Sequence, residues 1–377
     1  MSSEASIAAL QAARDAGLKW ASDTAPGFHR KRKGGGFVYI DDNGKPMRDP
    51  DHLWRIKALV IPPAWTDVWI CADEFGHIQA TGKDARHRKQ YRYHASWREV
   101  RDSNKYHRVI DFGKALPTIR QRIAADLRRH GLPREKVLAA VVRLMETTHI
   151  RVGNDEYAKE NHSYGLTTMR GRHASIHGNH VHFHFRGKSG VDHEIDFSDR
   201  RLARIVKECR DLPGQTLFQF LDHDGNVHHI GSHDVNHYLH ETVGDEFTAK
   251  DFRTWAGTVL AALALHEYEN FTSQRQARRY IVAAIESVAK KLGNTKAVCR
   301  KCYIHPEIFN AYMDGTLIQT LTNHVEKKLA GPLKNLSPAE SAVLMLLQQR
   351  LGHESARSNG NHQAQRQAAP QRVKSAA

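Results

Sequence analysis

The hydrophobic periodicity of the chain changes near residue 105, and this change limits the possible folds more than any other feature. Residues 27–95 hold short apolar and aromatic runs between turn signals, such as GGGFVYIDDNGKPM, a pattern typical of strands and hairpins. From about residue 110 the apolar positions recur with helical spacing, as in PREKVLAAVVRLMETTHI. We therefore predict an α+β protein, with a small β-rich N-terminal domain over residues 1–105 and a mainly helical domain over residues 106–352.

Three local patterns refine this prediction. In NHVHFHFRGKSGVDHEIDF, apolar residues alternate with histidines, which predicts a β-hairpin inserted in the helical domain with Lys188 at its tip. The segment LPTIRQRIAADLRRHG carries Pro117 near its start and Gly131 past its end, which predicts a helix between them. Ser337, Pro338 and Glu340 form a capping-box pattern for a last helix, and the polar residues 353–377 are expected to be a disordered tail.

The charge balance indicates a polyanionic partner. The 377 residues include 56 Lys+Arg against 41 Asp+Glu, a formal net charge of +15. The basic residues gather beside aromatic and polar ones, in the segments HRKRKGGGF (29–37), GKDARHRKQYRYH (82–94), MRGRH (169–173) and RQARRY (275–280). Such clusters can neutralise phosphates, so we predict nucleic-acid binding. The plainer alternative, a basic solvated surface, stays open for RQARRY.

Several other protein classes do not fit the sequence. No apolar run approaches the roughly 18 residues of a membrane span, and the acidic N-terminal stretch does not read as a secretion signal. Four cysteines in so long a chain do not make a disulfide framework, which suggests a reducing compartment. We expect a cytoplasmic protein with no membrane association, bound to the nucleoid if the source is bacterial.

Motifs for metals and nucleotides are incomplete. Gly187-Lys188-Ser189 lacks the glycine of a phosphate-binding loop, because His182 stands five positions before Gly187. Cys299 and Cys302 have no second ligand pair for zinc, and they lack the strand–helix context of a redox pair. The alternating histidines of the hairpin are too collinear to surround an ion, so a solvated or DNA-facing row is favoured. We expect neither a metal nor a cofactor.

Five segments in order are shared with one family. They are METTHIRVGN (145–154) with its continuation to Thr168, the hairpin tip Gly187-Lys188, KDFRTW (250–255), GNT (293–295) leading into RKCY (300–303), and RKQYRY (88–93) upstream. With these, the chain from about Gly17 to about Asp314 resembles the type IB DNA topoisomerases, in particular the small poxvirus-like and bacterial members. The resemblance implies a clamp around double-stranded DNA, formed by a monomer.

The resemblance also implies a role for each matching residue. Tyr303 would be the nucleophile that forms a 3′-phosphotyrosyl link, Arg151 and Arg253 would stabilise the transition state, and Lys188 would be the general acid. Asn294 stands where viral and eukaryotic members usually have histidine; an amide donates a hydrogen bond but carries no charge. Cys299 stands where serine is common. DNA-touching positions would be Arg86, Arg88, Lys89, Gln90, Tyr91, Tyr93 and Lys250.

Two alternatives remain. Tyrosine recombinases use a similar set of arginine, lysine and tyrosine, but they typically show H-x-x-R at the second arginine, where this chain has Lys250. A non-catalytic DNA-binding protein on the same scaffold would be expected to have lost Tyr303 or an arginine, and this chain retains them. The expected activity is therefore relaxation of supercoiled DNA by transient single-strand cleavage, without ATP or metal.

Overall fold

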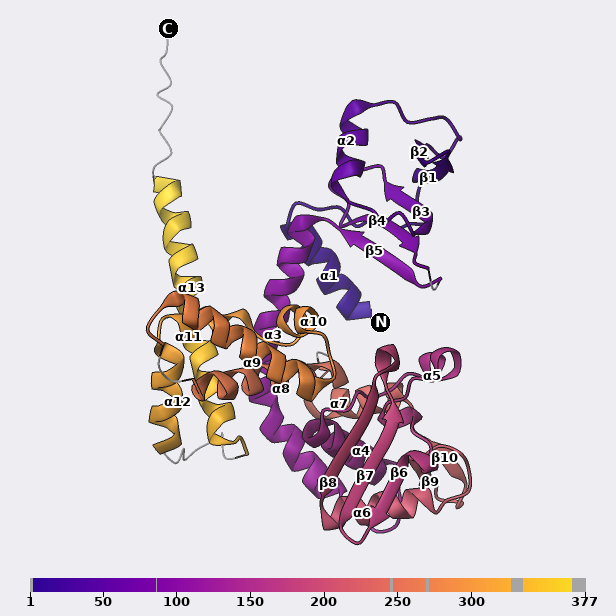
Figure 1. Cartoon of the computed structure of the whole chain (residues 1–377), viewed down its shortest axis with the longest axis vertical. Helices are drawn as coiled ribbons and strands as arrows, with labels where there is room; N and C mark the ends of the chain where they lie inside the picture. Colours follow the sequence, from indigo (N-terminus) through magenta and orange to yellow (C-terminus); the bar gives the residue numbers. More distant parts are fainter. Residues whose placement is uncertain (1–2, 86, 245–246, 269–270, 327–334, 368–377) are drawn as a thin grey trace. The chain divides into compact units, whose positions relative to one another are not determined.

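The computed structural model describes residues 3–85, 87–244, 247–268, 271–326 and 335–367 (Figure 1). The chain forms two compact units, Met1–His107 and Arg108–Ala377, which are described separately below. Helices and small antiparallel sheets both occur, so the predicted α+β class is confirmed. No helix in the described ranges is long and apolar enough to cross a membrane.

The first unit is built on one antiparallel sheet in the order β2-β1-β3-β4-β5. Its strands are β1 (Gly27–Lys33), β2 (Gly36–Ile40), β3 (Thr66–Cys71), β4 (Ile78–Lys83) and β5 (Lys89–Tyr93), and its helices are α1 (Ser3–Asp15) and α2 (Pro50–Ala58). Ile56 of α2 is buried in one cluster with Phe28, Val68, Ile70 and Ala80 of the sheet. This cluster makes α2 the cover of one sheet face.

A long helix, α3 (Ala95–Asp126), contains the boundary between the two units. The prediction of a helix that starts near Pro117 was wrong, because Pro117 lies inside α3. Proline in a helix interior loses one hydrogen bond to the residue four positions earlier, here Gly113. Gly113 packs against the indole of Trp255, so the loss of one bond is offset by tertiary packing.

The second unit is mainly helical and has one continuous core. Its helices are α4 (Arg134–Thr148), α5 (Asp155–Asn161), α6 (Arg200–Arg210), α7 (Ser232–Val243), α8 (Ala249–His266), α9 (Gln274–Leu292), α10 (Lys296–Cys302), α11 (Pro306–Met313), α12 (Thr316–Glu326) and α13 (Pro338–Gln367). Residues 137–142 of α4 are wholly buried, which places this helix at the centre of the core.

A three-stranded antiparallel sheet interrupts the helices, in the order β6-β7-β8. The predicted strand pair corresponds to β7 (His180–Arg186) and β8 (Asp192–Ser198), which pair from His180↔Ser198 to Arg186↔Asp192. The third strand, β6 (Ala174–His177), was not predicted. Val181, Phe183 and Phe185 of β7 face the core, as the alternating pattern requires. A separate short pair is formed by β9 (Gln219–Leu221) and β10 (Val227–His229).

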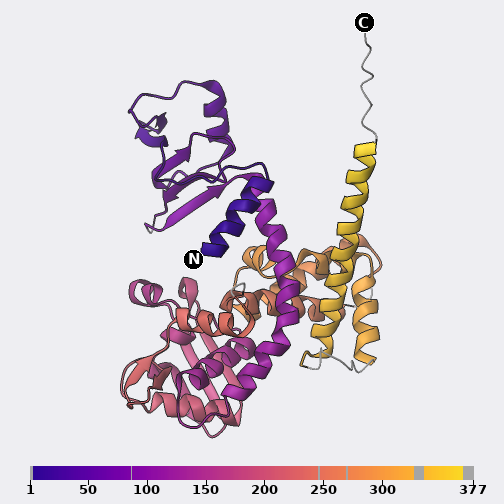
Figure 2. The same ribbon diagram turned by 180° about the vertical axis from the view of Figure 1, so that it is seen from behind.

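The last helix, α13, packs beside α12 and α8, as both views of the ribbon show for α12 (Figures 1 and 2). Its predicted capping box is confirmed: the Ser337 amide donates to Glu340 Oε2 (2.8 Å), and the Glu340 amide donates to Ser337 Oγ (3.2 Å). The helix continues to Gln367, beyond the expected start of a disordered tail at residue 353. Once a helix is nucleated, each added residue costs little. Residues 368–377 lie outside the described part.

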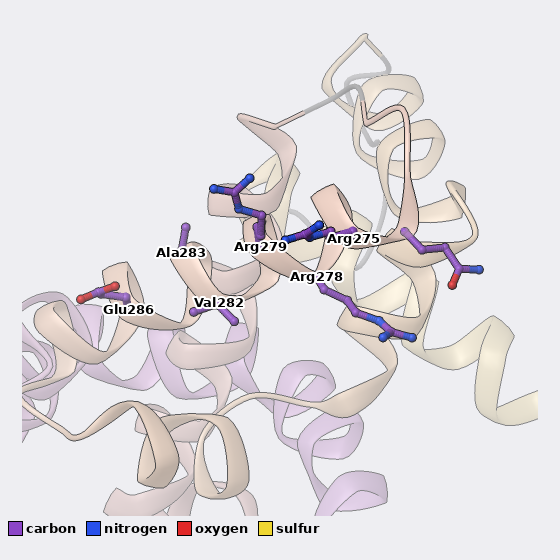
Figure 3. A pocket seen from close by; sticks show the side chains of 7 residues that line it. Arg275, Arg278, Arg279, Val282, Ala283 and Glu286 are labelled. Carbon is purple, nitrogen blue, oxygen red and sulfur yellow. The ribbon is translucent and has the colours of Figure 1, made fainter.

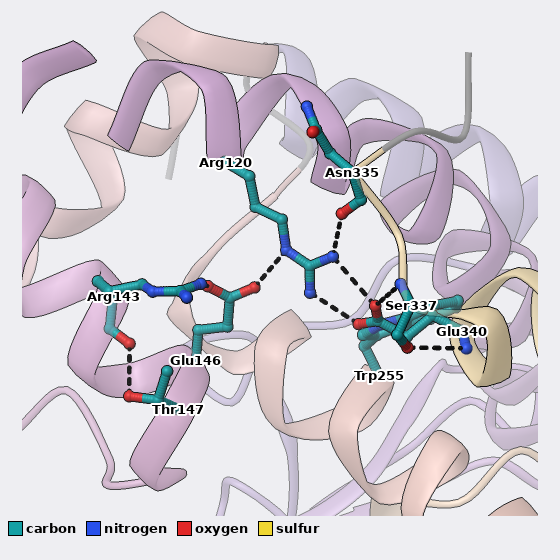
Figure 4. Close-up of polar contacts among 8 residues, drawn as sticks. All are labelled: Arg120, Arg143, Glu146, Thr147, Trp255, Asn335, Ser337 and Glu340. Atoms are coloured by element: carbon teal, nitrogen blue, oxygen red, sulfur yellow. Dashed lines mark hydrogen bonds and ion pairs between the residues drawn. The ribbon is translucent and has the colours of Figure 1, made fainter. Parts of the chain in front are cut away.

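A partly buried arginine connects α13 to the rest of the unit (Figure 4). Arg120 of α3 donates to Glu146 of α4 (2.6 Å) and forms a bidentate pair with Glu340 of α13 (2.8 and 3.0 Å). Trp255 Nε1 of α8 donates to the same Glu340 carboxylate (3.1 Å). The guanidinium joins α3, α4 and α13, and the Glu340 carboxylate connects α8 to them.

Candidate active site

Arg151 lies just after α4, in a backbone that two glycines hold in place. Gly153 has a φ of +112°, and a Cβ on Gly165 would lie 2.6 Å from Gly153 Cα, so these two segments touch backbone to backbone. The amide of Leu166 donates to the Arg151 carbonyl (2.9 Å). The segment that follows Gly165 thereby fixes the position of Arg151.

Arg253 projects from α8 and is only 6% exposed. Its guanidinium donates to the carbonyl of His149, at the end of α4, and to the carbonyl of Leu292, at the end of α9 (2.6 Å). Burial, and then the nearby Arg151 guanidinium, lower the pKa of Arg253 to about 10. Arg253 remains positively charged at neutral pH, although its surroundings oppose the charge.

Asn294 follows the left-handed residue Gly293 (φ +58°), which ends α9. Arg151 Nη2 donates to Asn294 Oδ1 at 2.5 Å. The other amide atom, Nδ2, is buried and has no hydrogen-bond partner among the described residues. The same is true of Nε of Arg253. Two buried hydrogen-bond donors, Asn294 Nδ2 and Arg253 Nε, thus lie near Arg151 without a partner among the described residues.

Tyr303 lies at the C-terminal end of α10, and the carbon Cζ of the Arg253 guanidinium stands 5.1 Å from the centroid of its ring. The backbone of Tyr303 packs directly on α8, since a Cβ on Gly257 would lie 2.5 Å from the Tyr303 carbonyl oxygen. Thr258 Oγ1 accepts a hydrogen bond from the His305 amide (3.1 Å) on the far side of Tyr303. The tyrosine is therefore fixed to the helix that carries Arg253.

Lys188 lies in the turn between β7 and β8, and its side chain is exposed. It lines one small pocket together with Arg151, Arg253 and Lys291, and no carboxylate of the described residues lines that pocket. The structure therefore brings Arg151, Arg253, Asn294 and Tyr303 together by direct contacts, and Lys188 by a shared pocket. A cationic pocket with unpaired donors is chemically suited to a phosphate group.

His193 was missed by the sequence reading, although it lines the same pocket. It lies on β8, opposite Phe185, and its ring stacks on that phenylalanine at 5.1 Å. Nothing in the local sequence distinguishes it from the other histidines of the hairpin. Only the packing of β8 against the end of α9 brings it to the site.

The predicted DNA-touching residues of the first unit are mostly engaged with acidic neighbours. Arg88 pairs with Asp84 (2.7 Å), Gln90 Nε2 donates to the same carboxylate (2.9 Å), and Lys89 pairs with Asp23 (2.5 Å). Tyr91 and Tyr93 stack at 5.8 Å between ring centroids, and Tyr91 is 41% exposed. Arg86 lies outside the described residues.

In the second unit, two basic positions lie apart from this group. Lys250 is exposed on the first turn of α8, one helical turn before Arg253. The segment RQARRY forms part of α9, where Arg275, Arg278 and Arg279 line an open surface pocket with Val282 and Glu286 (Figure 3). For this segment the solvated-surface alternative stays a prediction.

Cys299, four residues before Tyr303, lacks the properties of a reactive thiol. Cys299 is fully buried, and burial raises the pKa of its thiol to about 11, so it carries no thiolate at neutral pH. In the described ranges no group of three or more His, Cys, Asp or Glu side chains could hold a metal ion. His182 of the histidine row pairs instead with Asp196 (2.9 Å) across the sheet.

Comparison with known proteins gives matches over most of the chain. Residues 94–329 match the family model of the catalytic core of eukaryotic DNA topoisomerase I, and residues 36–84 match that of the N-terminal domain of bacterial DNA topoisomerase IB. DNA topoisomerase 1B of Acanthamoeba polyphaga mimivirus is 32% identical over 288 residues, which cover 74% of this chain and 85% of the relative. DNA topoisomerase 1B of Vaccinia virus (strain Copenhagen) is 23% identical over 300 residues, 76% and 91% of the two chains. On these matches, the chain belongs to the type IB DNA topoisomerase family.

Proposed function

We propose that this protein relaxes supercoiled duplex DNA by cutting and resealing one strand through a covalent link to Tyr303. The observation that carries the proposal is the meeting of Tyr303 with two arginines: the ring lies against Arg253, and Arg151 shares the pocket with Arg253. A tyrosine oxygen is a nucleophile, and guanidinium groups are the cations best matched to phosphate oxygens.

In the proposed reaction, the Tyr303 phenol oxygen attacks a phosphorus atom of the DNA backbone. A bond forms between that oxygen and phosphorus, while the bond from phosphorus to the 5′-oxygen breaks. The phenolic proton leaves to water or a base, and Lys188 supplies a proton to the departing 5′-oxygen. After the free strand has rotated, the 5′-hydroxyl attacks the phosphotyrosine and reverses these steps. No external energy source enters this balance.

Arg151, Arg253 and Asn294 would stabilise the pentacoordinate transition state. Charge builds up on the equatorial phosphate oxygens, and fixed donors around that position act without reorganisation. Arg253 Nε and Asn294 Nδ2 are buried donors without partners among the described residues, and they could take up such oxygens. The hydrogen bond between Arg151 and Asn294 would keep both groups in register.

We further infer that the two units of a monomer close around the duplex. Each unit carries basic and aromatic residues, and each matches a separate family model. In the first unit, Arg88 and Lys89 would exchange their bonds to Asp84 and Asp23 for bonds to DNA phosphates. Exchange of exposed ion pairs costs little, because such pairs contribute about 0–1 kcal/mol.

Supercoiled plasmid incubated with the purified protein in EDTA, without ATP, tests the proposal. We expect the wild type to relax the plasmid and to form a covalent protein–DNA adduct, and Tyr303→Phe to do neither. Tyr280→Phe is the matched control, because Tyr280 of α9 stacks on Tyr268 and takes no part in the proposed reaction. If the wild type binds DNA without relaxing it, a recombinase or a DNA-binding scaffold replaces the proposal.

A further inference from the structure

The imidazole of His193 is held between two glycines that neighbour proposed catalytic residues. A Cβ on Gly187, just before Lys188, would lie 2.5 Å from His193 Cδ2. A Cβ on Gly293, just before Asn294, would lie 2.4 Å from His193 Cε1. Both distances are shorter than any real contact, so the ring touches the bare backbone of both segments.

The ring is also fixed from its own sheet and by its electrostatic surroundings. It stacks on Phe185 with an interplanar angle of 16°. Burial, followed by the charges of Arg151 and Arg253, lowers the pKa of His193, while Asp192 acts weakly in the opposite direction. A neutral, stacked ring is well suited to act as a spacer, because it adds no charge to a pocket that already holds several cations.

We propose that His193 is a positioning residue, which sets the distance between the turn that carries Lys188 and the end of α9 that carries Asn294. Lys188 is exposed and its turn contains Ser189 at a φ of +67°, so the side chain depends on this turn for its location. The His193 ring touches the backbone of both segments, at Gly187 and at Gly293. The inference rests on the proposed function, since it assigns to His193 the placement of the proposed general acid.

A change of the leaving group in the DNA can distinguish placement of Lys188 by His193 from a purely structural role of His193. If sulfur replaces the bridging 5′-oxygen of the DNA, a thiolate departs, and a thiol of pKa about 8.5 needs no proton donor at neutral pH. Loss of Lys188, or of its placement, should then matter for oxygen-linked DNA and not for sulfur-linked DNA. Loss of Arg253 should slow cleavage of both.

The experiment compares single-turnover cleavage of the two DNAs by wild type, Lys188→Ala and His193→Ala. We expect His193→Ala to cut oxygen-linked DNA about 100-fold more slowly than wild type, as displacement of a catalytic group by about 1 Å can do. On sulfur-linked DNA it should approach the wild-type rate, as Lys188→Ala should. Equal slowing on both DNAs, or slowing on neither, overturns the role of His193. If the wild type cuts neither DNA, the proposed function itself fails.

Two further variants serve as controls, one for the substitution itself and one for a possible loss of folding. His228→Ala is the matched control, because His228 stacks on Phe220 at 5.2 Å in the separate strand pair β9–β10. This variant should cleave both DNAs at the wild-type rate. His193→Phe keeps a stacked ring, and its melting temperature is measured beside that of His193→Ala. If His193→Ala does not fold, His193→Phe decides: the proposal requires it to cut oxygen-linked DNA faster than Lys188→Ala, and an equally slow rate overturns it.

Discussion

Replacing Asn294 by aspartate should slow DNA cleavage more than replacing it by alanine. Alanine removes the buried Nδ2 donor, and a hydrogen bond to a charged group contributes about 1.5–3 kcal/mol, or roughly a 10- to 150-fold change in rate. Aspartate removes the same donor and adds a carboxylate where Arg151 is bound at 2.5 Å. The new carboxylate would repel the DNA phosphate. For two unit charges about 4 Å apart this repulsion is about 4 kcal/mol at an effective dielectric constant of 20, which slows cleavage by a further factor of about a thousand.

Single-turnover cleavage of oxygen-linked DNA at saturating enzyme measures both effects, and a filter-binding assay checks that DNA is still bound. Asn179→Asp is the matched control, because Asn179 lies exposed in the turn between β6 and β7 and undergoes the same change of charge. It should cleave at the wild-type rate. If Asn294→Asp cleaves as fast as Asn294→Ala, the amide does not face the phosphate and the reasoning is refuted.

Three other predictions concern stability, packing and DNA binding. Arg120→Ala leaves the largely buried Glu340 carboxylate without its cationic partner, while Glu146 keeps its pair with Arg143 (Figure 4). It should destabilise the protein by about 3–5 kcal/mol in thermal unfolding, against under about 1 kcal/mol for the exposed pair lost in Arg204→Ala. Burial raises the pKa of Glu340, but Arg120 holds it below its usual value, so the wild type should lose this stabilisation as the pH falls through the lowered pKa, and the deficit of the variant should shrink in acid. Gly257→Ala should slow cleavage without weakening DNA binding, because its Cβ would displace the Tyr303 carbonyl, and unchanged cleavage would contradict this contact. Affinity for duplex DNA should fall linearly with salt on logarithmic axes, and a flat response would argue against phosphate contacts.

Local patterns were sufficient for much of the fold. The capping box at Ser337 and Glu340 involves neighbours in sequence, and its two hydrogen bonds are present. The alternating residues around Phe183 predicted the strands of the hairpin, because a strand with one buried face must alternate. The location of Lys188 between these strands followed from the same pattern.

Contacts between residues far apart in the chain could not be predicted from the sequence. Pro117 reads as a helix start, yet it lies inside α3, which packs into the core on both sides of it, through Phe112 and Ile119 among others. Lys89 reads as a free cation, yet it pairs with Asp23, far away in sequence. His193 reads as one more histidine of the strand. Each of these outcomes depends on which elements meet in space, and no local pattern encodes that.

The pocket around Arg253 holds positive charge that no carboxylate of the described residues neutralises, and a DNA phosphate would neutralise it. Burial lowers the pKa of both Arg151 and Arg253, so each guanidinium is held where its charge is disfavoured. Neither arginine takes part in an ion pair among the described residues, whereas the partly buried Arg120 pairs with two carboxylates. Arg120 is neutralised by acidic partners, whereas the partners found for Arg151 and Arg253 among the described residues are carbonyls, the Asn294 amide and Tyr303. An uncompensated charge weakens the free protein, but it binds most strongly to the state in which the phosphate oxygens carry the most charge. This difference from Arg120, together with the contact of Arg253 with the Tyr303 ring, supports the proposal that Arg253 binds a phosphate.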